Sequence, residues 1–391
     1  MIKVALLHFC FEDYTIELAN SLVKYVDLTL IHPEKVSYFC SNVLDSSIRV
    51  ISFKKPRIRD PRNLLSMVAM MNIIKDIQPD VLHVQETNDP WYDWTLLLNK
   101  MPPLVTTIHD VFRHPGDNIT AFGSEYTRRI GFYRSQQLIV HTHQLKNILI
   151  EQFRISQEQV NVLPHGELGS LYRRRVSQNI QAREPYTLLF FGRILPYKGL
   201  KYLLEAMPLI AECIPEVKLI IAGRGESVRQ YFPNGYDENR YEIINDFIPI
   251  EEVGNLFQRS TVTVLPYIEA SQSGVAALSY GMGTLVVASE VGGLSEIVQH
   301  KKDGLLVPPC DARTLADAII CLLSDRSLQQ RMQTAALARC QQDLNWSNIA
   351  AQTVEVYQKT LKEAGGRRQE AGGRRHKIYG DSNPNQIVSA V

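Results

Sequence analysis

Residues 262–287, with the sequence VTVLPYIEASQSGVAALSYGMGTLVV, decide the fold of this chain. A β-branched run ends at Pro266, a polar turn follows, and small residues with helical spacing lead to a second apolar run at 285–287. This order of strand, loop, helix and strand is typical of a parallel α/β unit. In such a unit the polar turn lies at the carboxyl edge of the sheet, where free helix N–H groups suit an anion such as a diphosphate. A single turn of this kind could equally be an ordinary crossover whose Ser and Gln cap the helix.

The same alternation of strands and helices continues outward through the chain in two blocks. Strands are expected at residues 4–8, 28–31, 81–84, 105–109, 138–141 and 160–163, and again at 187–191, 217–222, 241–244, 262–265 and 285–288. Helical periodicity between these runs favours doubly wound parallel sheets. An arginine-rich stretch at 173–185 separates the blocks. We therefore expect an α/β protein with an N-terminal domain over 1–175 and a C-terminal domain over 176–345, which face each other across a cleft.

The end of the chain has a different pattern. An amphipathic segment predicts a last helix over residues 346–364, which we expect to pack back towards the N-terminal domain. The hexapeptide EAGGRR then occurs twice, at 363–368 and 370–375. Because glycine and charge without apolar residues cannot form a core, residues 365–391 are expected to be a disordered tail.

Length and composition set the general class of protein. A chain of 391 residues with 45% hydrophobic and 21% charged residues has the composition of a soluble globular protein of two domains. With 42 basic and 41 acidic residues, no net field favours nucleic acid as a partner. The six cysteines are scattered singly, which is typical of a reducing compartment. No signal peptide or apolar segment of spanning length is recognisable, so we expect a cytoplasmic protein with at most peripheral membrane contact.

Three segments of the second block have features suited to phosphate. Gly192 ends a strand and is followed by Arg193 and Lys198, two cations that could lie over one anion, although cations in a loop are more often simply solvated. Gly223 and Arg224 lie in a glycine-rich turn after the next strand, which alone is a weak signal. The segment 291–296, VGGLSE, is another start of a helix after a strand.

Together, the segments FFGRILPYKGLKYLLEAMPLI (190–210), KLIIAGRGE (218–226), VTVLPYIEASQSGV (262–275) and TLVVASEVGGLSEIV (284–298) resemble glycosyltransferase family 4. The KDGLLV segment at 302–307 extends this resemblance, which spans most of the second block. It implies the GT-B fold of two facing Rossmann-like domains, and a retaining enzyme that uses a nucleotide diphosphate sugar.

The resemblance also implies roles for particular residues. Arg193 and Lys198 would bind the donor diphosphate, Glu269 would lie beside the donor sugar, and the end of the 241–244 strand would receive the base. The donor-binding residues expected on this ground are Gly192, Gly223, Arg224, Asp246, Phe247, Ile248, Gln272, Ser273, Gly274 and Val275. The family commonly has a second glutamate near the ribose, where this chain has Ala277 and Leu278. Glu296 is the candidate substitute.

The first block carries fewer signals. His109, in the segment TTIHD at a strand end, resembles the family histidine that reaches the donor sugar, although a strand-end histidine is often structural. Asp110, His114 and His83 are candidates for the acceptor side; His83 and Glu86 could instead satisfy one another. The family's Gly-Gly loop after the first strand is replaced by FEDY at 11–14, so acceptor handling is not transferable. A basic stretch at 54–62 could bind a lipid-linked diphosphate or an anionic membrane, or be solvated.

The function expected from these features is transfer of a sugar to a hydroxyl acceptor, of the hexosyltransferase type, with retention of configuration. We expect it to serve polysaccharide or glycoconjugate biosynthesis, with no cofactor and no metal, because side-chain cations can stabilise the leaving diphosphate. Two alternatives stay open: a sugar-nucleotide epimerase or hydrolase of the same fold, and a non-catalytic nucleotide-sugar-binding subunit. The donor sugar, base, acceptor and oligomeric state are left undetermined by the sequence.

Overall fold

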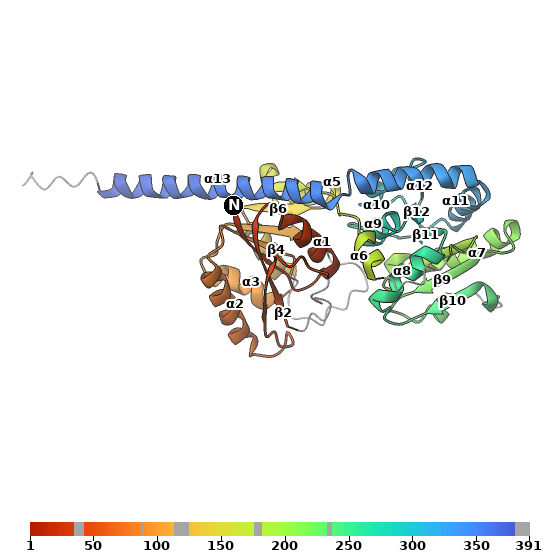
Figure 1. Cartoon of the computed structure of the whole chain (residues 1–391), viewed down its shortest axis with the longest axis horizontal. Coiled ribbons are helices and arrows are strands. Elements are labelled where there is room, and N and C mark those ends of the chain that lie inside the picture. The colour runs from red at the N-terminus through yellow and green to blue at the C-terminus, as the bar shows by residue number, and fades with distance from the viewer. Residues whose placement is uncertain (35–42, 88, 113–124, 176–181, 233–236, 380–391) are drawn as a thin grey trace, which may run out of the picture.

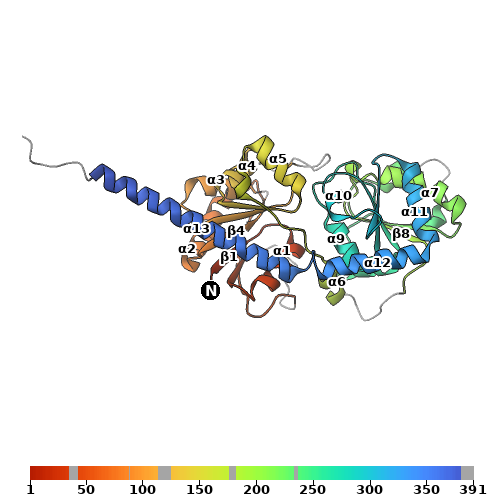
Figure 2. The same cartoon turned by 90° about the horizontal axis from the view of Figure 1, so that it is seen from above.

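The computed structural model describes residues 1–34, 43–87, 89–112, 125–175, 182–232 and 237–379, and His114 lies outside these ranges. Two parallel sheets, each flanked by helices, form two domains side by side (Figure 1, Figure 2). The expected architecture of two doubly wound parallel sheets is confirmed.

The N-terminal sheet has seven parallel strands in the order β3-β2-β1-β4-β5-β6-β7. Its strands are β1 (Lys3–Leu7), β2 (Asp27–Pro33), β3 (Arg49–Phe53), β4 (Val81–Gln85), β5 (Leu104–Ile108), β6 (Gln137–Val140) and β7 (Val160–Val162). Its helices are α1 (Glu12–Leu22), α2 (Asn63–Ile77), α3 (Pro90–Leu98), α4 (Glu125–Arg134) and α5 (His143–Phe153). The central strands β1, β4 and β5 are almost continuously buried because helices cover both faces of the sheet.

The C-terminal sheet has six parallel strands in the order β10-β9-β8-β11-β12-β13. Its strands are β8 (Thr187–Phe191), β9 (Lys218–Ala222), β10 (Tyr241–Ile244), β11 (Val262–Leu265), β12 (Leu285–Ser289) and β13 (Gly304–Val307). The helices are α7 (Leu200–Cys213), α8 (Ile250–Arg259), α9 (Gly274–Gly281), α10 (Leu294–Ile297), α11 (Ala312–Ser324) and α12 (Arg326–Gln341). The sequence patterns did not predict β3 or β13, which are short strands at the sheet edges.

The chain passes between the domains at two neighbouring places. The first crossing precedes α6 (Gly169–Arg175), which packs against α8 and α9 and also contacts α1 through an ion pair of Arg174 with Glu17. The second crossing lies between α12 and α13 (Trp346–Tyr379). The two are joined where Glu167 N donates to Leu344 O at 3.0 Å and Trp346 Nε1 donates to Glu167 O at 2.5 Å.

Helix α13 leaves the C-terminal domain and runs along the N-terminal domain (Figure 1, Figure 2). It packs against α1, β4, β5 and β6. The Tyr357 hydroxyl lies 2.7 Å from His83 Nδ1, and Gln137 Nε2 donates to Glu363 Oε1 at 2.6 Å. The helix therefore belongs mechanically to the N-terminal domain.

The expectation of a disordered tail from residue 365 is wrong for residues 365–379, because α13 continues to Tyr379. Alanine, glutamate, glutamine and arginine of the EAGGRR repeats have high helix propensities. They extend a helix already nucleated by packing, which offsets a cost of roughly 1 kcal/mol for each glycine. Residues 380–391 lie outside the described part of the chain.

Candidate active site

The loops after β8 and β11 meet where the strand order of the C-terminal sheet reverses, the usual ligand crevice of an open parallel sheet. Gly192 (φ +114°) and Gly223 (φ +151°) have backbone conformations that favour glycine. A Cβ on Gly223 would lie 1.8 Å from the Gly192 oxygen. The loops after β8 and β9 are also joined where Ile194 N donates to Arg224 O at 2.9 Å. The glycines therefore form a compact rim that places Arg193 and Arg224 side by side.

Aromatic residues hold Arg193 of this rim and Lys198, which follows it in the same loop. Lys198 Nζ lies 3.8 Å from the centre of the Tyr267 ring, and Arg193 Nη2 donates to the Tyr197 hydroxyl at 3.3 Å. Burial lowers the pKa of the Lys198 ammonium; Asp110 of the N-terminal domain has a smaller, opposite effect on it. Aromatic faces stabilise a cation without neutralising its charge, so this arrangement suits an anionic ligand.

Helix α9 directs its first turn into the space between the domains. The Ser273 hydroxyl accepts from Ala276 N at 3.3 Å and caps the helix. From the other domain, His165 Nε2 approaches to 3.6 Å from the position that a Cβ on Gly274 would take. His165 Nδ1 lies 2.8 Å from Gly166 O, so Nδ1 carries the proton and Nε2 is an acceptor in the neutral ring. Burial lowers the pKa of His165 to about 4, which keeps the ring neutral.

Two cavities are lined by residues of both domains. One, of about 440 Å³, is lined by Glu269 together with Phe112 and Gln144 of the N-terminal domain. The other, of about 220 Å³, is lined by Gln272, Ser273, His141 and His165. The structure thus brings Glu269 and Gln272 to the boundary between the domains.

The predicted base site lies at the edge of the same sheet. Phe247 follows β10 and is 56% exposed, whereas Ile248 is buried. Asp246 Oδ1 accepts from Phe247 N at 2.7 Å. An exposed aromatic ring held by its neighbour is a suitable platform for stacking a nucleobase.

Glu296 has a different position from the one expected for a ribose ligand. Its two carboxylate oxygens accept from His143 N at 2.7 Å and Gln144 N at 2.8 Å. These are the first free amides of α5, so a carboxylate of the C-terminal domain caps a helix of the N-terminal domain. In this structure the carboxylate is engaged by α5, and the ribose role is not supported.

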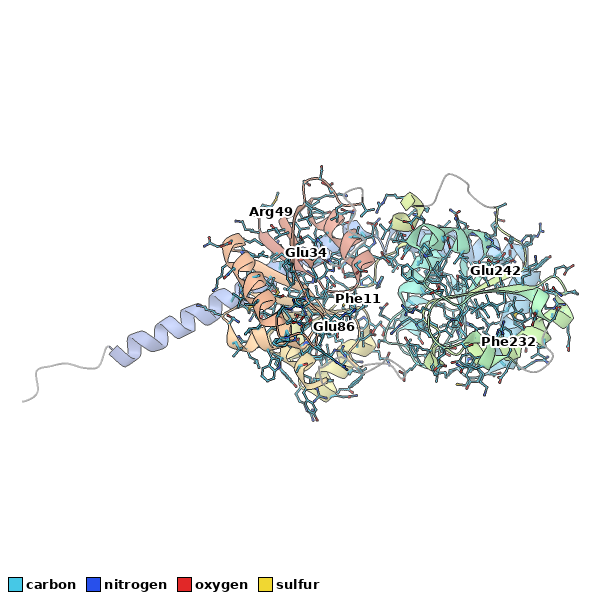
Figure 3. The ribbon with its side chains drawn as sticks, turned by 90° about the horizontal axis from the view of Figure 1, so that it is seen from below. Phe11, Glu34, Arg49, Glu86, Phe232 and Glu242 are labelled. Carbon is cyan, nitrogen blue, oxygen red and sulfur yellow. The ribbon has the colours of Figure 1, made fainter. Side chains whose placement is uncertain are left out.

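His109 is fully buried and does not reach the donor loops. Phe11, on the side of the N-terminal domain that faces the C-terminal domain (Figure 3), stacks on its ring at 3.8 Å between centres. His109 Nδ1 lies 3.2 Å from His141 Nε2, and Gln85 lies 3.0 Å from His109 Nε2. Burial lowers the pKa of His109 well below its ordinary value and that of His141 to about 3.

A consistent proton arrangement exists for this histidine chain. His141 Nδ1 lies 3.0 Å from Leu163 O and must donate, so His141 Nε2 accepts from His109 Nδ1. His109 Nε2 is then an acceptor, which requires the Gln85 amide to be oriented with its NH₂ group towards it. The chain is neutral throughout, and a role for His109 on the donor sugar requires Phe11 to move.

His83 is not an acceptor-side residue in this structure. It is fully buried, with Nδ1 at 2.7 Å from the Tyr357 hydroxyl and Nε2 at 2.8 Å from the Thr107 hydroxyl. The expectation failed because the partner on α13 is 274 residues away in sequence. Glu86 does not pair with His83 either, since its carboxylate binds Arg128 and accepts from the amides of His109 and Asp110 at 3.0 and 3.2 Å.

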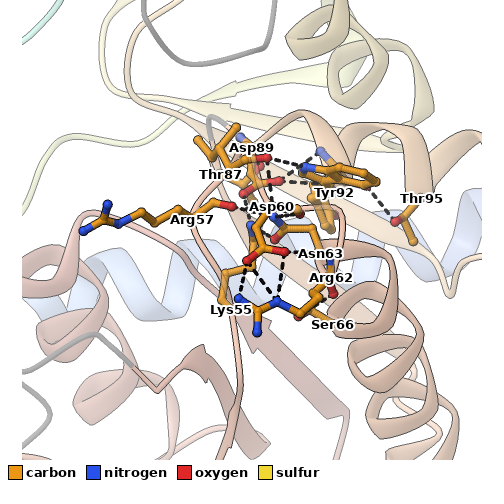
Figure 4. Close-up of polar contacts among 12 residues, drawn as sticks. Lys55, Arg57, Asp60, Arg62, Asn63, Ser66, Thr87, Asp89, Tyr92 and Thr95 are labelled. Carbon is orange, nitrogen blue, oxygen red and sulfur yellow. Dashed lines mark hydrogen bonds and ion pairs between the residues drawn. The ribbon is translucent and has the colours of Figure 1, made fainter.

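The basic stretch at 54–62 is partly neutralised within its own domain (Figure 4). Lys55 Nζ lies 2.7 Å from Asp89 Oδ2, and both side chains are nearly buried. Arg62 pairs with Asp60 at 2.6 Å. The guanidinium of Arg57 points away from this cluster (Figure 4). The loop is therefore ordered by two ion pairs, and only part of its charge faces outward.

Sequence reasoning missed His141 and His165, which line the cavity opposite α9. Both follow strands of the parallel sheet, β6 and β7, and the rule that ligand-site residues follow such strands could have found them. Within the described part of the chain, no group of three or more His, Cys, Asp or Glu side chains is arranged to hold a metal ion. No described helix combines the length and apolar character needed to cross a bilayer.

Two family models match the two domains separately. The model described as "Glycosyl transferase 4-like" matches residues 3–142, and the one described as "Glycosyl transferases group 1" matches residues 185–325. Among curated relatives, a glycosyltransferase of Methanocaldococcus jannaschii is 29% identical over 67% of this chain and 71% of the relative. The D-inositol 3-phosphate glycosyltransferase of Pseudarthrobacter chlorophenolicus is 28% identical over 78% of this chain and 77% of the relative. The chain belongs to the group 1, family 4 type of glycosyltransferases.

Solved structures confirm the GT-B arrangement. The sucrose-phosphate synthase of Thermosynechococcus elongatus has a TM-score of 0.70 at 21% identity, over 93% of this chain and all of that one. The Anabaena protein HepE, solved in complex with UDP-glucose, has a TM-score of 0.68 at 18% identity, over 92% of this chain and 100% of that one. A UDP-GlcNAc 2-epimerase of Neisseria meningitidis bound to UDP-GlcNAc matches at 0.61 and 14% identity, over 92% and 100%. The family models and the curated relatives support sugar transfer in glycoconjugate biosynthesis as the function of this chain.

Proposed function

We propose that this glycosyltransferase moves a hexose from a nucleotide diphosphate sugar to a hydroxyl acceptor and retains the anomeric configuration. The observation that carries the proposal is the pair Arg193 and Lys198, held by Tyr197 and Tyr267 beside the N-terminus of α9. Both cations and the free amides of α9 lie at the reversal of strand order, where a diphosphate would bind.

The leaving group explains why this chemistry needs such an environment. The bridging oxygen of the diphosphate gains negative charge as the glycosidic bond breaks, and preorganised cations and amides stabilise that charge. The two cations can act in this way without a metal. We propose attack by the acceptor on the face from which the diphosphate leaves, with the leaving phosphate accepting the proton. Glu269 would position the sugar from the cavity at the domain boundary.

The base and its binding platform form a separate part of the proposal. Phe247 would stack on the base and Asp246 would fix the backbone beside it. UDP is the first nucleotide to test, because HepE was solved with UDP-glucose and sucrose-phosphate synthase has the same fold. The proposal also includes a cytoplasmic protein that contacts the inner face of a membrane peripherally.

Thermal-shift binding tests the donor site directly. UDP, GDP, ADP and their sugar conjugates would each be added to the wild type and to Lys198→Ala. We expect one nucleotide to raise the melting temperature of the wild type selectively, and the Lys198→Ala variant to lose most of that rise. Lys201→Ala is the matched control, since Lys201 is an exposed cation on the next helix that pairs only loosely with Glu205 at 3.7 Å. An equal rise in wild type and Lys198→Ala would overturn the assignment.

A second candidate has its own supporting observation. The helix positions where the family commonly carries its second glutamate are occupied by Ala277 and Leu278, both buried in the core, and the fold also occurs in a UDP-GlcNAc 2-epimerase. A nucleotide-sugar-binding subunit without transfer activity, or an epimerase, would fit these facts. Turnover of the donor without any acceptor would favour the epimerase; binding without turnover would favour the subunit.

A further inference from the structure

We propose that the outer faces of α2, α3 and α4 form a docking surface for an anionic lipid bilayer. This inference rests on the proposed peripheral membrane contact and assigns it to particular residues. It concerns the side of the N-terminal domain built by α2 and α3, at the end of the molecule away from the C-terminal domain (Figure 1).

Helix α3 exposes an unusual set of side chains. Its sequence, PWYDWTLLL, is apolar on both sides of the helix. Tyr92 and Leu96 are buried in the core, whereas Trp94, Leu97 and Leu98 are between 49% and 78% exposed. These three lie at i, i+3 and i+4 and therefore share one face. A helix that is apolar all round is normally covered on all sides, so this outer face is an exception that needs a partner.

The neighbouring helices also expose apolar and aromatic side chains. Helix α3 packs between α2 and α4. The N-terminal half of α2 exposes Leu64, Leu65 and Val68, each at 52% or more, and α4 exposes Tyr126 and Tyr133. Tryptophan and tyrosine have an apolar body and a polar tip, which is the combination found at the interface between lipid and water.

Exposed cations lie on the loop tied to the start of α3 and just after its end. Lys54 and Arg57 are exposed on the loop that leads into α2, and Lys100 is exposed directly after α3. Figure 4 shows the Arg57 side chain projecting away from the ion pairs that order this loop. The Lys55–Asp89 pair ties the loop to the N-cap of α3, because Asp89 also accepts from Trp91 N at 3.0 Å. Apolar and cationic groups are therefore held together by one rigid connection.

This combination favours an anionic bilayer over a second copy of the chain. In a symmetric dimer the same surface would meet itself, so Lys54, Arg57 and Lys100 would approach like charges. Anionic lipid headgroups are complementary to those cations and attract a lysine or arginine that lies near the membrane surface. The exposed Trp and Leu side chains can enter the boundary between headgroups and acyl chains.

Docking in this way would bring the acceptor side of the enzyme close to lipid. Helix α3 begins directly after β4, at the carboxyl edge of the N-terminal sheet, and has nine residues. Its length is therefore about 13–14 Å. The edge that faces the donor loops lies roughly one short helix away from the docking surface, so an acceptor hydroxyl carried on a membrane lipid could reach it.

Vesicle co-sedimentation tests this proposal on the full-length chain. Vesicles of phosphatidylcholine alone and of phosphatidylcholine with 30% phosphatidylglycerol would be compared. We expect the wild type to bind the anionic vesicles, and Trp94→Glu/Leu98→Glu to bind at least tenfold more weakly. Lys54→Glu/Arg57→Glu should lose affinity in low salt and differ less from the wild type in high salt. The matched control is Leu337→Glu, since Leu337 is a 42% exposed leucine on α12 of the other domain.

Each other outcome overturns the proposal. It fails if the wild type does not bind anionic vesicles, or if Trp94→Glu/Leu98→Glu binds them as well as the wild type. A dimer detected by sedimentation velocity, and dissolved by the same double substitution, would assign the surface to a second copy instead. Nucleotide thermal shifts should be unchanged in all these variants, so failure of membrane docking is distinguishable from failure of the donor site.

Discussion

The carboxyl edges of the two sheets have the same topology, but their polar side chains are arranged differently. In the C-terminal domain, the loops after β8 and β11 present cations and helix amides to the space between the domains, and aromatic residues hold the cations in place. In the N-terminal domain, the residues after β4, β5 and β6 satisfy one another through the chain of His109 and His141 and the pair of Glu86 with Arg128. The difference teaches that one domain is prepared for a ligand, whereas the other is closed upon itself in this conformation.

The largest effect on activity is expected from a substitution in the C-terminal domain, whose carboxyl edge is prepared for a ligand. We expect Lys198→Ala to reduce transfer by roughly 10²–10³-fold, about 2.7–4 kcal/mol of lost transition-state stabilisation. The reason is that the substitution removes one of the two cations proposed to stabilise the leaving diphosphate, the ammonium held at 3.8 Å from the Tyr267 ring. Steady-state kinetics with the donor found by thermal shift would measure this, with circular dichroism to check the fold. Near-normal transfer would contradict the role of Lys198.

A substitution among the buried polar groups of the N-terminal domain should lower the stability of the protein without weakening donor binding. Tyr357→Phe removes the hydroxyl at 2.7 Å from the buried His83 and leaves a polar nitrogen without its partner. We expect a loss of about 1–3 kcal/mol, seen as a lower midpoint in urea unfolding. The nucleotide thermal shift should keep its size. A large loss of nucleotide binding would show that the two domains are less independent than this comparison implies.

A substitution of Glu296 tests the contact between the two domains. We expect Glu296→Ala to remove the cap of α5 and to cost about 0.5–2 kcal/mol in the contact between the domains. Nucleotide affinity should change little, since the carboxylate binds His143 and Gln144 amides. Isothermal titration with the matching nucleotide separates the two roles. If affinity fell tenfold or more, Glu296 would be a ribose ligand after all.

The smallest effect is expected on stability, from a buried carboxyl group in the N-terminal domain. Burial raises the pKa of Asp93 from 3.8 to about 7. Between these values the unfolded chain is ionised at this position while the folded one is not, so stability falls as pH rises from about 4 to 7. Asp93→Asn should remove that decline, so the variant should gain stability relative to the wild type as the pH rises from 4 to 8. Equal gains at both pH values would show that ionisation is not the cause.

The same contrast explains which features could be predicted from the sequence. Both doubly wound sheets and the positions of Arg193, Lys198, Ser273 and Gly274 follow from local patterns, because strand, turn and helix start lie within about ten residues of each other. The surroundings of His83 and Glu296 depend on partners 274 and about 150 residues away, which no local pattern contains. Strands β3 and β13 were not predicted, although the other two edge strands, β7 and β10, were.

The paired crossings between the domains have a mechanical consequence. The two chain segments that connect the domains are joined by hydrogen bonds at Glu167, Leu344 and Trp346, and together they form one hinge. We expect such a hinge to permit rotation of one domain against the other about the line through the two crossings, and to resist other relative movements of the domains. We expect opening of the enzyme to be mainly a change of one angle between the domains, and α13, bonded to the N-terminal domain through Tyr357 and Glu363, to move with that domain.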